Sequence, residues 1–480
     1  MVLIQNQEIL SFSNQILLGA NPEDLSLLTL SEKEIAYINQ KISQKINLIH
    51  LNRLDTHIFI VWEDLQNKEA YKIQENYRSR AFETFQLLEK ERIENIQLIS
   101  TEENSGFLLD FTEGLLLSTY KFLKYKTEKP KSELKEIGVF APGITQNRLD
   151  ELFNLIQGNF QCRNLVNEPV LYLTAEKLSE EIEGLGKEAG FNVEVFHKAK
   201  IESLGMVGLL TVNKGSVDPP TFTVLEYKPE NAAPGKTFVL VGKGVVFDTG
   251  GLSLKPTPAS MDFMKCDMAG GAAVAGTIYA LAKNKVPLHV VGLIPATDNR
   301  PGGNAITPCD VITMMNGKTV EILNTDAEGR LILADALLYA KRYHPTLVID
   351  LATLTGAAAM AIGKEAMVMM GTASEAFKME LRQSGAYTHE RLVEFPLWEE
   401  YAEQLKSDIA DISNIGKLNA GAITAGKFLE YFTDYPWIHL DIAGTAFLNT
   451  ADKYRGPQGT GSGVRCLYHF LKKQVNSSAE

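Results

Sequence analysis

The chain is 480 residues long, a length that predicts about two or three domains. Hydrophobic residues make up 45% of it and charged residues 22%, which is typical of a globular protein with a sizeable core. The 47 basic and 59 acidic side chains leave a net charge of −12, and no long basic run is present. We therefore do not expect nucleic acid to be a partner.

Cysteine spacing and apolar runs predict a cytoplasmic protein that does not enter the membrane. No basic segment precedes the first apolar residues, so we expect no signal peptide. The longest low-charge stretch, Leu351–Gly363, is too short to cross a bilayer. Four widely spaced cysteines without a C-x-x-C motif indicate reduced thiols instead of a disulfide framework or a zinc finger. They are Cys162, Cys266, Cys309 and Cys466.

Residues 1–160 are predicted to form a smaller N-terminal α/β domain. Short apolar runs alternate there with charged stretches of helical length, a pattern typical of βαβ units. The charged run Lys124–Glu136 contains Pro130 and indicates an exposed loop. We find no catalytic constellation in this region. The predicted strands are Ile46–Leu51, His57–Trp62, Ile96–Ile99 and Ile137–Ala141.

A helix over Arg148–Phe160 is predicted to link this domain to a larger α/β domain, residues 161–480. Continuous apolar runs follow, as in strands of a mostly parallel central sheet covered on both faces. Helices are expected between them at Gly271–Lys283 and Arg330–Tyr343. The predicted strands are Phe238–Val241, Leu288–Ile294, Thr346–Leu351 and Trp437–Ile442.

Three acidic clusters of the larger domain lie where strands end or helices begin. The first follows a glycine-rich turn and contains Lys243, Asp248 and Lys255. Asp267 closes the second, and the third is the octapeptide at 324–331. Open α/β sheets bind ligands in the crevice at these ends of their strands. We therefore expect the clusters to face one crevice.

Each cluster has a simpler interpretation when taken alone. Thr325 and Glu328 match a capping box, and Asp267 could be a helix N-cap. Gly242 and Gly244 lack the third glycine of a dinucleotide fingerprint. The Gly-Lys-Thr at 235–237 is like the end of a P-loop, but a strand follows it instead of preceding it. We reject a nucleoside triphosphate site on that ground.

Taken together, the clusters indicate a metal centre. Four buried carboxylates without compensation would be prohibitively costly. Two divalent cations would balance them, and Lys243 could be a neutral ligand because adjacent dications depress the pKa of its amine. Oxygen ligands and one amine leave the choice among zinc, manganese, cobalt and magnesium open.

The octapeptide Asn-Thr-Asp-Ala-Glu-Gly-Arg-Leu at 324–331 resembles the signature of the leucyl aminopeptidase family of dinuclear metallopeptidases. The stretches at 243–251, 261–268, 350–356 and 439–444 also match the family pattern. The resemblance spans roughly residues 163–470, and no motif in residues 1–160 matches. The segment Pro256–Ser260 is one residue longer than the usual family spacing.

This resemblance implies a metal-dependent aminopeptidase that acts on peptides through a metal-bridged hydroxide. It implies two zinc or manganese ions, with Asp248 and Glu328 bridging them. Lys255 and Arg330 are the implied catalytic pair, and Arg330 would hold bicarbonate. The implied assembly is a homohexamer. The implied metal ligands are Lys243, Asp248, Asp267, Asp326 and Glu328.

The resemblance also implies a pocket for the first side chain of the substrate. Its residues are apolar or small and carry no charge, so we expect Leu and Met to be preferred over acidic residues. The implied pocket residues are Met264, Thr353, Leu354, Gly356, Ala443 and Ala446.

Other functions remain open at this point. One is a binding or regulatory protein on a degenerate peptidase scaffold, because fold alone does not define function. Another is a different dinuclear hydrolase, such as a dipeptidase or a phosphoesterase. The intact ligand positions argue against the first and the octapeptide against the second. His439, two residues before Asp441 in a predicted strand, is interpreted as structural.

Overall fold

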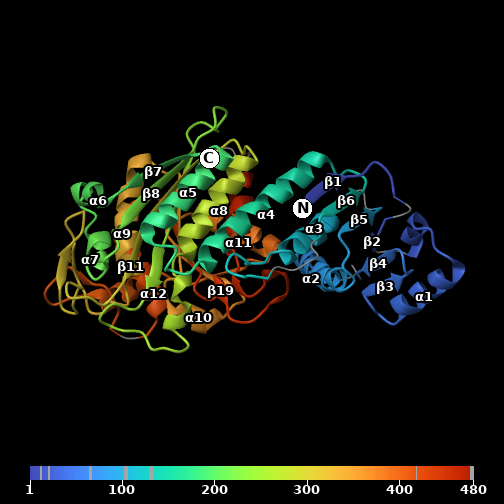
Figure 1. Ribbon diagram of the computed structural model, residues 1–480. Coiled ribbons are helices and arrows are strands. Elements are labelled where there is room, and N and C mark those ends of the chain that lie inside the picture. Colours follow the sequence, from blue (N-terminus) through green and yellow to red (C-terminus); the bar gives the residue numbers. More distant parts are fainter. Residues whose placement is uncertain are drawn as a thin grey trace. The chain divides into compact units, whose positions relative to one another are not determined.

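The computed structural model divides the chain into two compact units. The N-terminal unit contains Met1–Ile156 and Ala451–Gly456, and the larger unit contains Gln157–Thr450 and Pro457–Glu480 (Figure 1). Both units mix helices and strands, which confirms the two-domain α/β fold. The boundary between the two units falls within one helix, α4 (Gln146–Asn167). This helix is longer than the predicted linking helix. The described residues are 1–10, 13–19, 22–63, 68–101, 106–128, 134–417 and 419–475.

The N-terminal unit is built on a six-stranded sheet in the order β1-β6-β5-β2-β4-β3. Its pairs are parallel except for β3 with β4 at one edge. The strands are β1 (Val2–Gln5), β2 (Gln15–Gly19), β3 (Leu48–Asn52), β4 (His57–Trp62), β5 (Asn95–Ser100) and β6 (Glu136–Phe140). The helices are η1 (Pro22–Leu27), α1 (Glu32–Ser43), α2 (Ala70–Lys90), α3 (Gly106–Ser118) and η5 (Lys453–Arg455).

Four strands of this sheet lie where the apolar runs predict them, with ends that shift by a residue or two. The run His57–Trp62 matches β4 at both ends. Of the predicted loop, residues 124–128 are exposed and β6 begins at Glu136. Residues 129–133 of that loop, including Pro130, lie outside the described residues.

The larger unit is built on a nine-stranded sheet whose centre, β18-β14-β9-β11, is parallel. Antiparallel strands lie towards both edges, where β8 pairs with β11 and β15 pairs with β18. This arrangement confirms the mostly parallel central sheet. The strands are β7 (Asn192–Phe196), β8 (Thr221–Tyr227), β9 (Thr237–Gly242), β10 (Gly244–Asp248), β11 (His289–Asn299), β14 (Leu347–Ala352), β15 (Met367–Gly371), β16 (Leu392–Glu394) and β18 (Trp437–Asp441).

Helices cover both faces of this sheet. The helix α8 (Ala269–Lys283) contacts β9, β11 and β14, and a Cβ on Gly292 would meet its side chains. The helix α9 (Gly329–Ala340) lies on the other face, where Val291 and Leu293 join its buried cluster. Consecutive residues of β11 thus face opposite sides of the sheet, as expected of a strand buried on both sides.

Shorter elements complete the larger unit. They are α5 (Ala175–Ala189), α6 (Lys198–Leu204), α7 (Val207–Asn213), η2 (Met261–Cys266), β12 (Val311–Thr313), β13 (Thr319–Glu321), η3 (Lys341–Tyr343), α10 (Gly356–Ile362), α11 (Glu375–Thr388), η4 (Glu399–Leu405), β17 (Ile412–Ser413), α12 (Gly421–Glu430), β19 (Phe447–Leu448), β20 (Gln458–Gly459) and α13 (Val464–Gln474). Among the described residues, no helix combines the length and the apolarity that crossing a membrane requires.

One strand differs from its prediction in a way that matters for the site. β11 continues past the predicted end at Ile294 and reaches Asn299. Its polar end stays in the sheet because it pairs with β10, where Asn299 lies opposite Asp248. The apolar run alone did not reveal this extension.

Candidate active site

The three predicted clusters meet at the carboxyl ends of the parallel strands. Lys243 lies between β9 and β10, and Asp248 is the last residue of β10. Asp267 follows η2, and Asp326 and Glu328 immediately precede α9. Residues distant in sequence therefore meet at one edge of the sheet, where open α/β sheets bind ligands.

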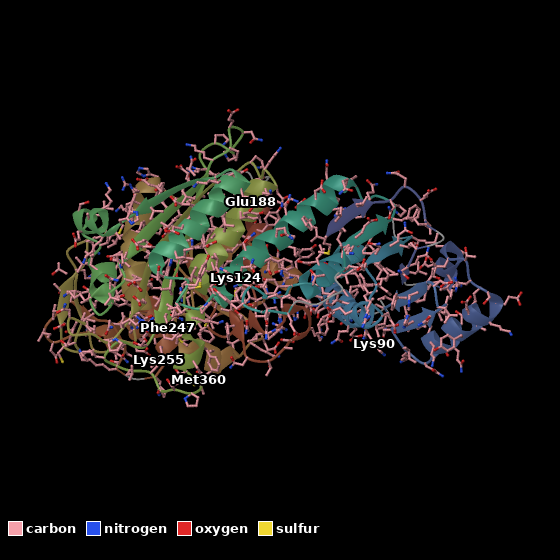
Figure 2. The ribbon with its side chains drawn as sticks, in the orientation of Figure 1. Lys90, Lys124, Glu188, Phe247, Lys255 and Met360 are labelled. Carbon is pink, nitrogen blue, oxygen red and sulfur yellow. The ribbon has the colours of Figure 1, made fainter. Side chains whose placement is uncertain are left out.

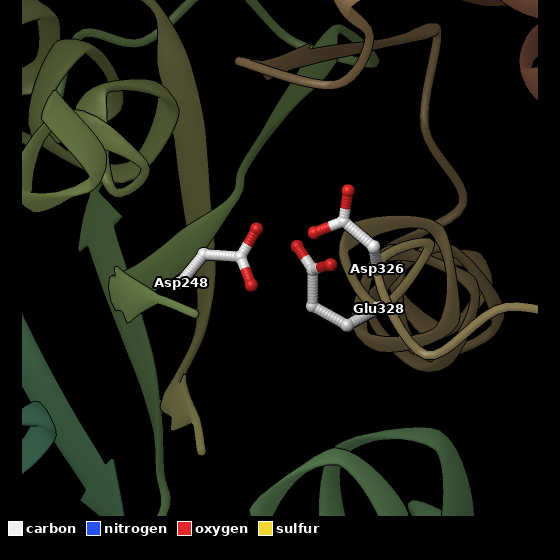
Figure 3. Close-up of side chains that lie close together, drawn as sticks. All are labelled: Asp248, Asp326 and Glu328. Carbon is white, nitrogen blue, oxygen red and sulfur yellow. The ribbon is translucent and has the colours of Figure 1, made fainter. Parts of the chain in front are cut away.

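Three of the predicted ligands form a compact carboxylate group. One oxygen from each of Asp248, Asp326 and Glu328 lies within 4.8 Å of the others. In Figure 3 the carboxylate of Asp248, from one side, faces those of Asp326 and Glu328. Asp248 and Glu328 are buried and Asp326 is partly buried. Close acceptors of this kind suit a divalent cation.

Lys243 connects this group to Asp267. Its Nζ atom lies 2.8 Å from Glu328 Oε1 and 2.7 Å from Asp267 Oδ2. The lysine reaches this position because a glycine lies beside it. A Cβ on Gly329 would lie 2.5 Å from Cε of Lys243, so a larger residue there would displace the amine. This contact explains the glycine of the octapeptide.

Lys255 reaches the same carboxylates from a different loop. Its Nζ atom lies 2.8 Å from Asp248 Oδ2 and 2.5 Å from Asp326 Oδ1. The additional residue in the segment Pro256–Ser260 therefore leaves Lys255 at the carboxylate group. The position of Lys255 in the larger unit is labelled in Figure 2.

Burial and like charges shape the electrostatics. Burial, together with the charge of Glu328, raises the pKa of Asp248 to about 7. Burial likewise raises the pKa of Asp267 above its ordinary value. Burial opposes the charged amines of Lys243 and Lys255, but the surrounding carboxylates outweigh it and raise the pKa of both. The protein alone therefore holds more acidic groups here than it can ionise cheaply.

The donor set fits the two divalent ions that the resemblance implies. Four carboxylates face only two lysine ammonium groups. Oε2 of Glu328 is buried and has no hydrogen-bond partner among the described residues. A buried carboxylate oxygen without a donor is costly, and a cation would satisfy it.

The helix-cap interpretations of these clusters are wrong. Glu328 is itself the N-cap of α9 and makes no side-chain cap hydrogen bond. The hydroxyl of Thr325 instead donates to Gly250 O at 2.6 Å, which ties the octapeptide to the loop after Asp248. Met268, and not Asp267, is the N-cap of α8. Neither Glu328 nor Asp267 therefore serves as a side-chain cap of the helix that follows it.

Arg330 is buried at the start of α9, beside the carboxylate group. Its Nη1 donates to Asn414 O at 2.6 Å, while its Nε has no hydrogen-bond partner among the described residues. Burial lowers the pKa of Arg330 to about 10, although the negative charges of Glu328, Asp441 and Asp326 act to raise it.

The predicted pocket residues come from four segments of the larger unit. Met264 is partly buried in η2, and Thr353 and Leu354 are partly buried after β14. Gly356 is exposed at the start of α10. Ala443 is partly buried and Ala446 buried in the loop after β18, the strand that pairs with β14. Thr353 has a further contact, since its hydroxyl donates to Asp267 Oδ1 at 2.7 Å.

Sequence reasoning missed Asn299, Asn414 and Asp441. Asn299 Nδ2 donates to Asp248 Oδ1 at 2.8 Å and to Thr325 O at 3.0 Å, so it joins two of the clusters. Asn414 accepts from Leu323 N and donates to Asn324 O, which orders the start of the octapeptide. No local motif marks either asparagine. The acidic residue within the family-like stretch at 439–444 was a signal for Asp441.

Comparison with known proteins defines the class. Residues 160–468 match the model of the cytosol aminopeptidase family, catalytic domain. The chain is 49% identical over 376 residues to a probable cytosol aminopeptidase of Chlorobaculum tepidum, covering 75% of this chain and 74% of that one. A probable cytosol aminopeptidase of Chlorobium limicola is 47% identical over 379 residues, covering 76% and 74%.

Solved structures agree over nearly the whole chain. The bottromycin maturation enzyme BotP in complex with Mn has a TM-score of 0.85 at 28% identity, covering 97% of this chain and 100% of that one. A variant of tomato leucine aminopeptidase has a TM-score of 0.85 at 25% identity, covering 98% and 96%. The protein is thus a metal-dependent hydrolase of the leucyl aminopeptidase type. It belongs to the cytosol aminopeptidase family.

Proposed function

We propose that this aminopeptidase releases N-terminal residues, preferably apolar ones such as Leu and Met, from peptides. The observation that carries the proposal is the convergence of Asp248, Asp326 and Glu328 on one point, with Lys243 and Lys255 beside them. Membership of the family supplies the reaction class, and the crevice residues supply the specificity.

Two divalent ions are proposed to bind at the carboxylates, with Asp248 and Glu328 shared between them. Such ions, when bound, supply Lewis acidity that polarises the scissile carbonyl and acidifies a bridging water to hydroxide. Zinc and manganese both suit oxygen ligands with one amine. Manganese gains support from BotP, whose structure is described as a complex with Mn. The proposed ligands are Lys243, Asp248, Asp267, Asp326 and Glu328.

Lys255 and Arg330 are proposed to act directly on the reacting groups. The ammonium group of Lys255 lies beside Asp248 and Asp326. It is proposed to donate to the oxyanion that develops on the substrate carbonyl. Arg330 leaves its Nε without a partner among the described residues and would hold bicarbonate, an anion able to relay a proton. Neither residue is proposed as a metal ligand.

The apolar preference follows from the residues around the crevice. Met264, Leu354 and Ala446 offer apolar surface, and none of the predicted pocket residues carries a charge. Burying a leucine side chain there would contribute roughly 1.5–3 kcal/mol. An acidic side chain would lose its hydration without gaining a partner. Leu and Met should therefore be released faster than Asp and Glu.

The test compares leucyl and glutamyl substrates that are otherwise identical. Purified protein should lose activity on exhaustive chelation and regain it with manganese or zinc. We expect kcat/KM to be higher for the leucyl substrate. Full activity without metal would overturn the metal assignment, and equal kcat/KM values would overturn only the pocket.

A second test separates the two lysines. Lys255→Ala should lower kcat by about 100-fold, the scale of losing one oxyanion donor, and keep its metal content. Lys243→Ala should instead lose metal, because its amine is the proposed ligand. If the Lys255 variant were the one to lose metal, the two roles would have to be exchanged.

We also propose that the protein is cytoplasmic and assembles as a homohexamer. The cytosol aminopeptidases of Chlorobaculum and Chlorobium support the location, and family resemblance supports the assembly. Light scattering of the purified chain tests the assembly. A stable, fully active monomer would contradict it.

A further inference from the structure

Asp441 has no part in the metal chemistry described above, yet its side chain accepts three hydrogen bonds. It is buried at the end of β18. Its Oδ1 accepts from Leu354 N at 3.2 Å and from Ala443 N at 3.1 Å. Its Oδ2 accepts from the hydroxyl of Thr355 at 2.7 Å. Both oxygens of this buried carboxylate are therefore engaged.

These three donors come from the two loops that carry most of the proposed pocket. Leu354 and Thr355 follow β14, and Ala443 follows β18. The two strands pair with Ala352 opposite Asp441, so their loops leave the sheet side by side. Asp441 lies at this point of divergence and bonds to both loops.

The loop after β14 is also held at its other end. Thr353 donates its hydroxyl to Asp267, and its carbonyl oxygen accepts from Lys243 Nζ at 3.1 Å. The backbone between Thr353 and Thr355 is thus held between the metal-site residues and Asp441. Loss of Asp441 would release one end of this loop and leave the other in place.

The same bonds reach the helix beyond the loop. The hydroxyl of Thr355 donates to Asp441 and accepts from Ala358 N at 3.0 Å, as the N-cap of α10. A hydroxyl whose proton is committed to a carboxylate keeps its lone pairs for the helix N–H groups. Asp441 therefore orients the start of α10 through Thr355.

We propose that Asp441 is a positioning residue that sets the width of the pocket for the substrate's first side chain. The proposal rests on the proposed function, which assigns Leu354 and Ala443 to that pocket. Asp441 acts through the two loops and touches neither the metals nor the scissile bond. Its removal should weaken recognition of a large first side chain and leave metal binding intact.

The experiment uses Asp441→Ala and Asp441→Asn, with leucyl and glycyl substrates that share one leaving group. In Asp441→Ala we expect the ratio of leucyl to glycyl kcat/KM to fall by about 10-fold, mainly through KM, because a displaced loop no longer fits the leucine. Metal content should equal that of the unaltered protein. Asn keeps an oxygen for both backbone N–H groups, so Asp441→Asn should recover most of the ratio.

Asp350→Asn is the matched control. Asp350 is a buried carboxylate on β14, but it bonds to Trp437 Nε1 and His439 Nδ1, both on β18, and to neither pocket loop among the described contacts. It should lower thermal stability without changing the leucyl-to-glycyl ratio. An unchanged ratio in folded Asp441→Ala, or a fall in its metal content with the ratio preserved, would overturn the proposal.

Hydrogen exchange separates failure of this proposal from failure of the proposed function. The amides of Leu354 and Ala443, which donate to Asp441 Oδ1, should exchange faster in Asp441→Ala than in Asp350→Asn. If exchange is faster in the variant but the unaltered protein shows no preference for the leucyl substrate, the pocket assignment of the proposed function is overturned and the role of Asp441 in holding the loops is not. Unchanged exchange in Asp441→Ala would overturn the role of Asp441 itself. If that variant failed to fold, Asp441→Asn would provide the test at Ala358. Its amide N–H would donate to the Thr355 hydroxyl, so the Ala358 N–H should exchange faster, and unchanged exchange there would overturn the role.

Discussion

Each of the two units buries a cluster of charged side chains, and the carboxylates are arranged differently in the two clusters. In the N-terminal unit Arg78 lies between Asp110 at 2.5 Å and Glu113 at 2.6 Å, all almost fully buried. Asp110 and Glu113 are three residues apart on α3, so they present one face to α2. Both carboxylates meet the same guanidinium, and the cluster joins two helices.

In the larger unit Lys243 and Lys255 each pair with two carboxylates. The carboxylates of Asp248, Asp326 and Glu328 face one another (Figure 3). They come from strand ends and loops instead of one helix face. Among the described residues this is the one group of His, Cys, Asp or Glu that meets the spacing for a metal ion. Buried charge by itself thus does not mark a site; carboxylates from separate elements that converge on one point do.

The largest expected effect distinguishes the two clusters by one substitution. Asp248→Asn should remove metal and lower kcat/KM by more than about 100-fold, because an amide offers one uncharged oxygen where the carboxylate offers two oxygens and a negative charge. Asp110→Asn, the same change in the N-terminal cluster, should leave metal content and activity unchanged. Metal analysis with a leucyl substrate measures both. Metal loss in the Asp110 variant would contradict the distinction.

Arg78→Met should destabilise the N-terminal unit by about 3–5 kcal/mol, because two carboxylates would remain buried without their cation. Hydrogen exchange of the α2 and α3 amides measures this loss. Replacing Asp110 and Glu113 by Leu in the same chain should restore most of the stability. If Arg78→Met also emptied the metal site, the two clusters would not be independent.

A smaller effect is expected from the positioning of Asp248. Asn299→Ala removes the hydrogen bonds to Asp248 Oδ1 and Thr325 O and should weaken metal affinity by about 10- to 100-fold. Titration of the metal-free protein with manganese measures the change. Asn316→Ala, at an exposed turn of the same unit, serves as the control. Equal affinity in both variants would show that Asn299 does not orient the ligand.

The smallest effect concerns an ion pair at the surface of the N-terminal unit. Glu34 accepts from both Nε and Nη2 of Arg53, and this pair lowers the pKa of Glu34 from 4.5 to about 2. Its contribution should therefore be complete above pH 4.5 and disappear as the pH falls through about 2. Glu34→Gln should lower the free energy of unfolding by less than about 1 kcal/mol at pH 7. If Glu34→Gln lowered the free energy of unfolding equally at pH 2, the ion pair with Arg53 would not be the cause of the loss.

Four strands in each unit could be predicted because their signal is local. The apolar runs behind β4, β9, β14 and β18 are continuous, and burial on both faces requires such runs. β11 was predicted too short because Thr297, Asp298 and Asn299 are polar but buried. Pairing with β10, which no local pattern encodes, keeps them in the sheet.

The residues of the candidate site were likewise predicted from local motifs, while one alternative to them could be excluded only from the fold. The octapeptide at 324–331 and the stretches before it identified the family and every proposed metal ligand by themselves, because those residues stand in short contiguous motifs. The acidic residues also match a capping box, and only the fold, in which Thr325 bonds to Gly250, excluded that alternative.

Tertiary structure alone decided which residues support the site. Asn299 and Asn414 occur in no motif, and Asp441 reaches Leu354 across 87 positions of the chain. Each acts by a hydrogen bond to an element distant in sequence, and such a bond leaves no trace in local composition or periodicity. The sequence by itself determined the chemistry of this protein, since reactive side chains must be present as residues. The fold determined their geometry, since orientation is set by contacts between strands and loops that meet only after folding.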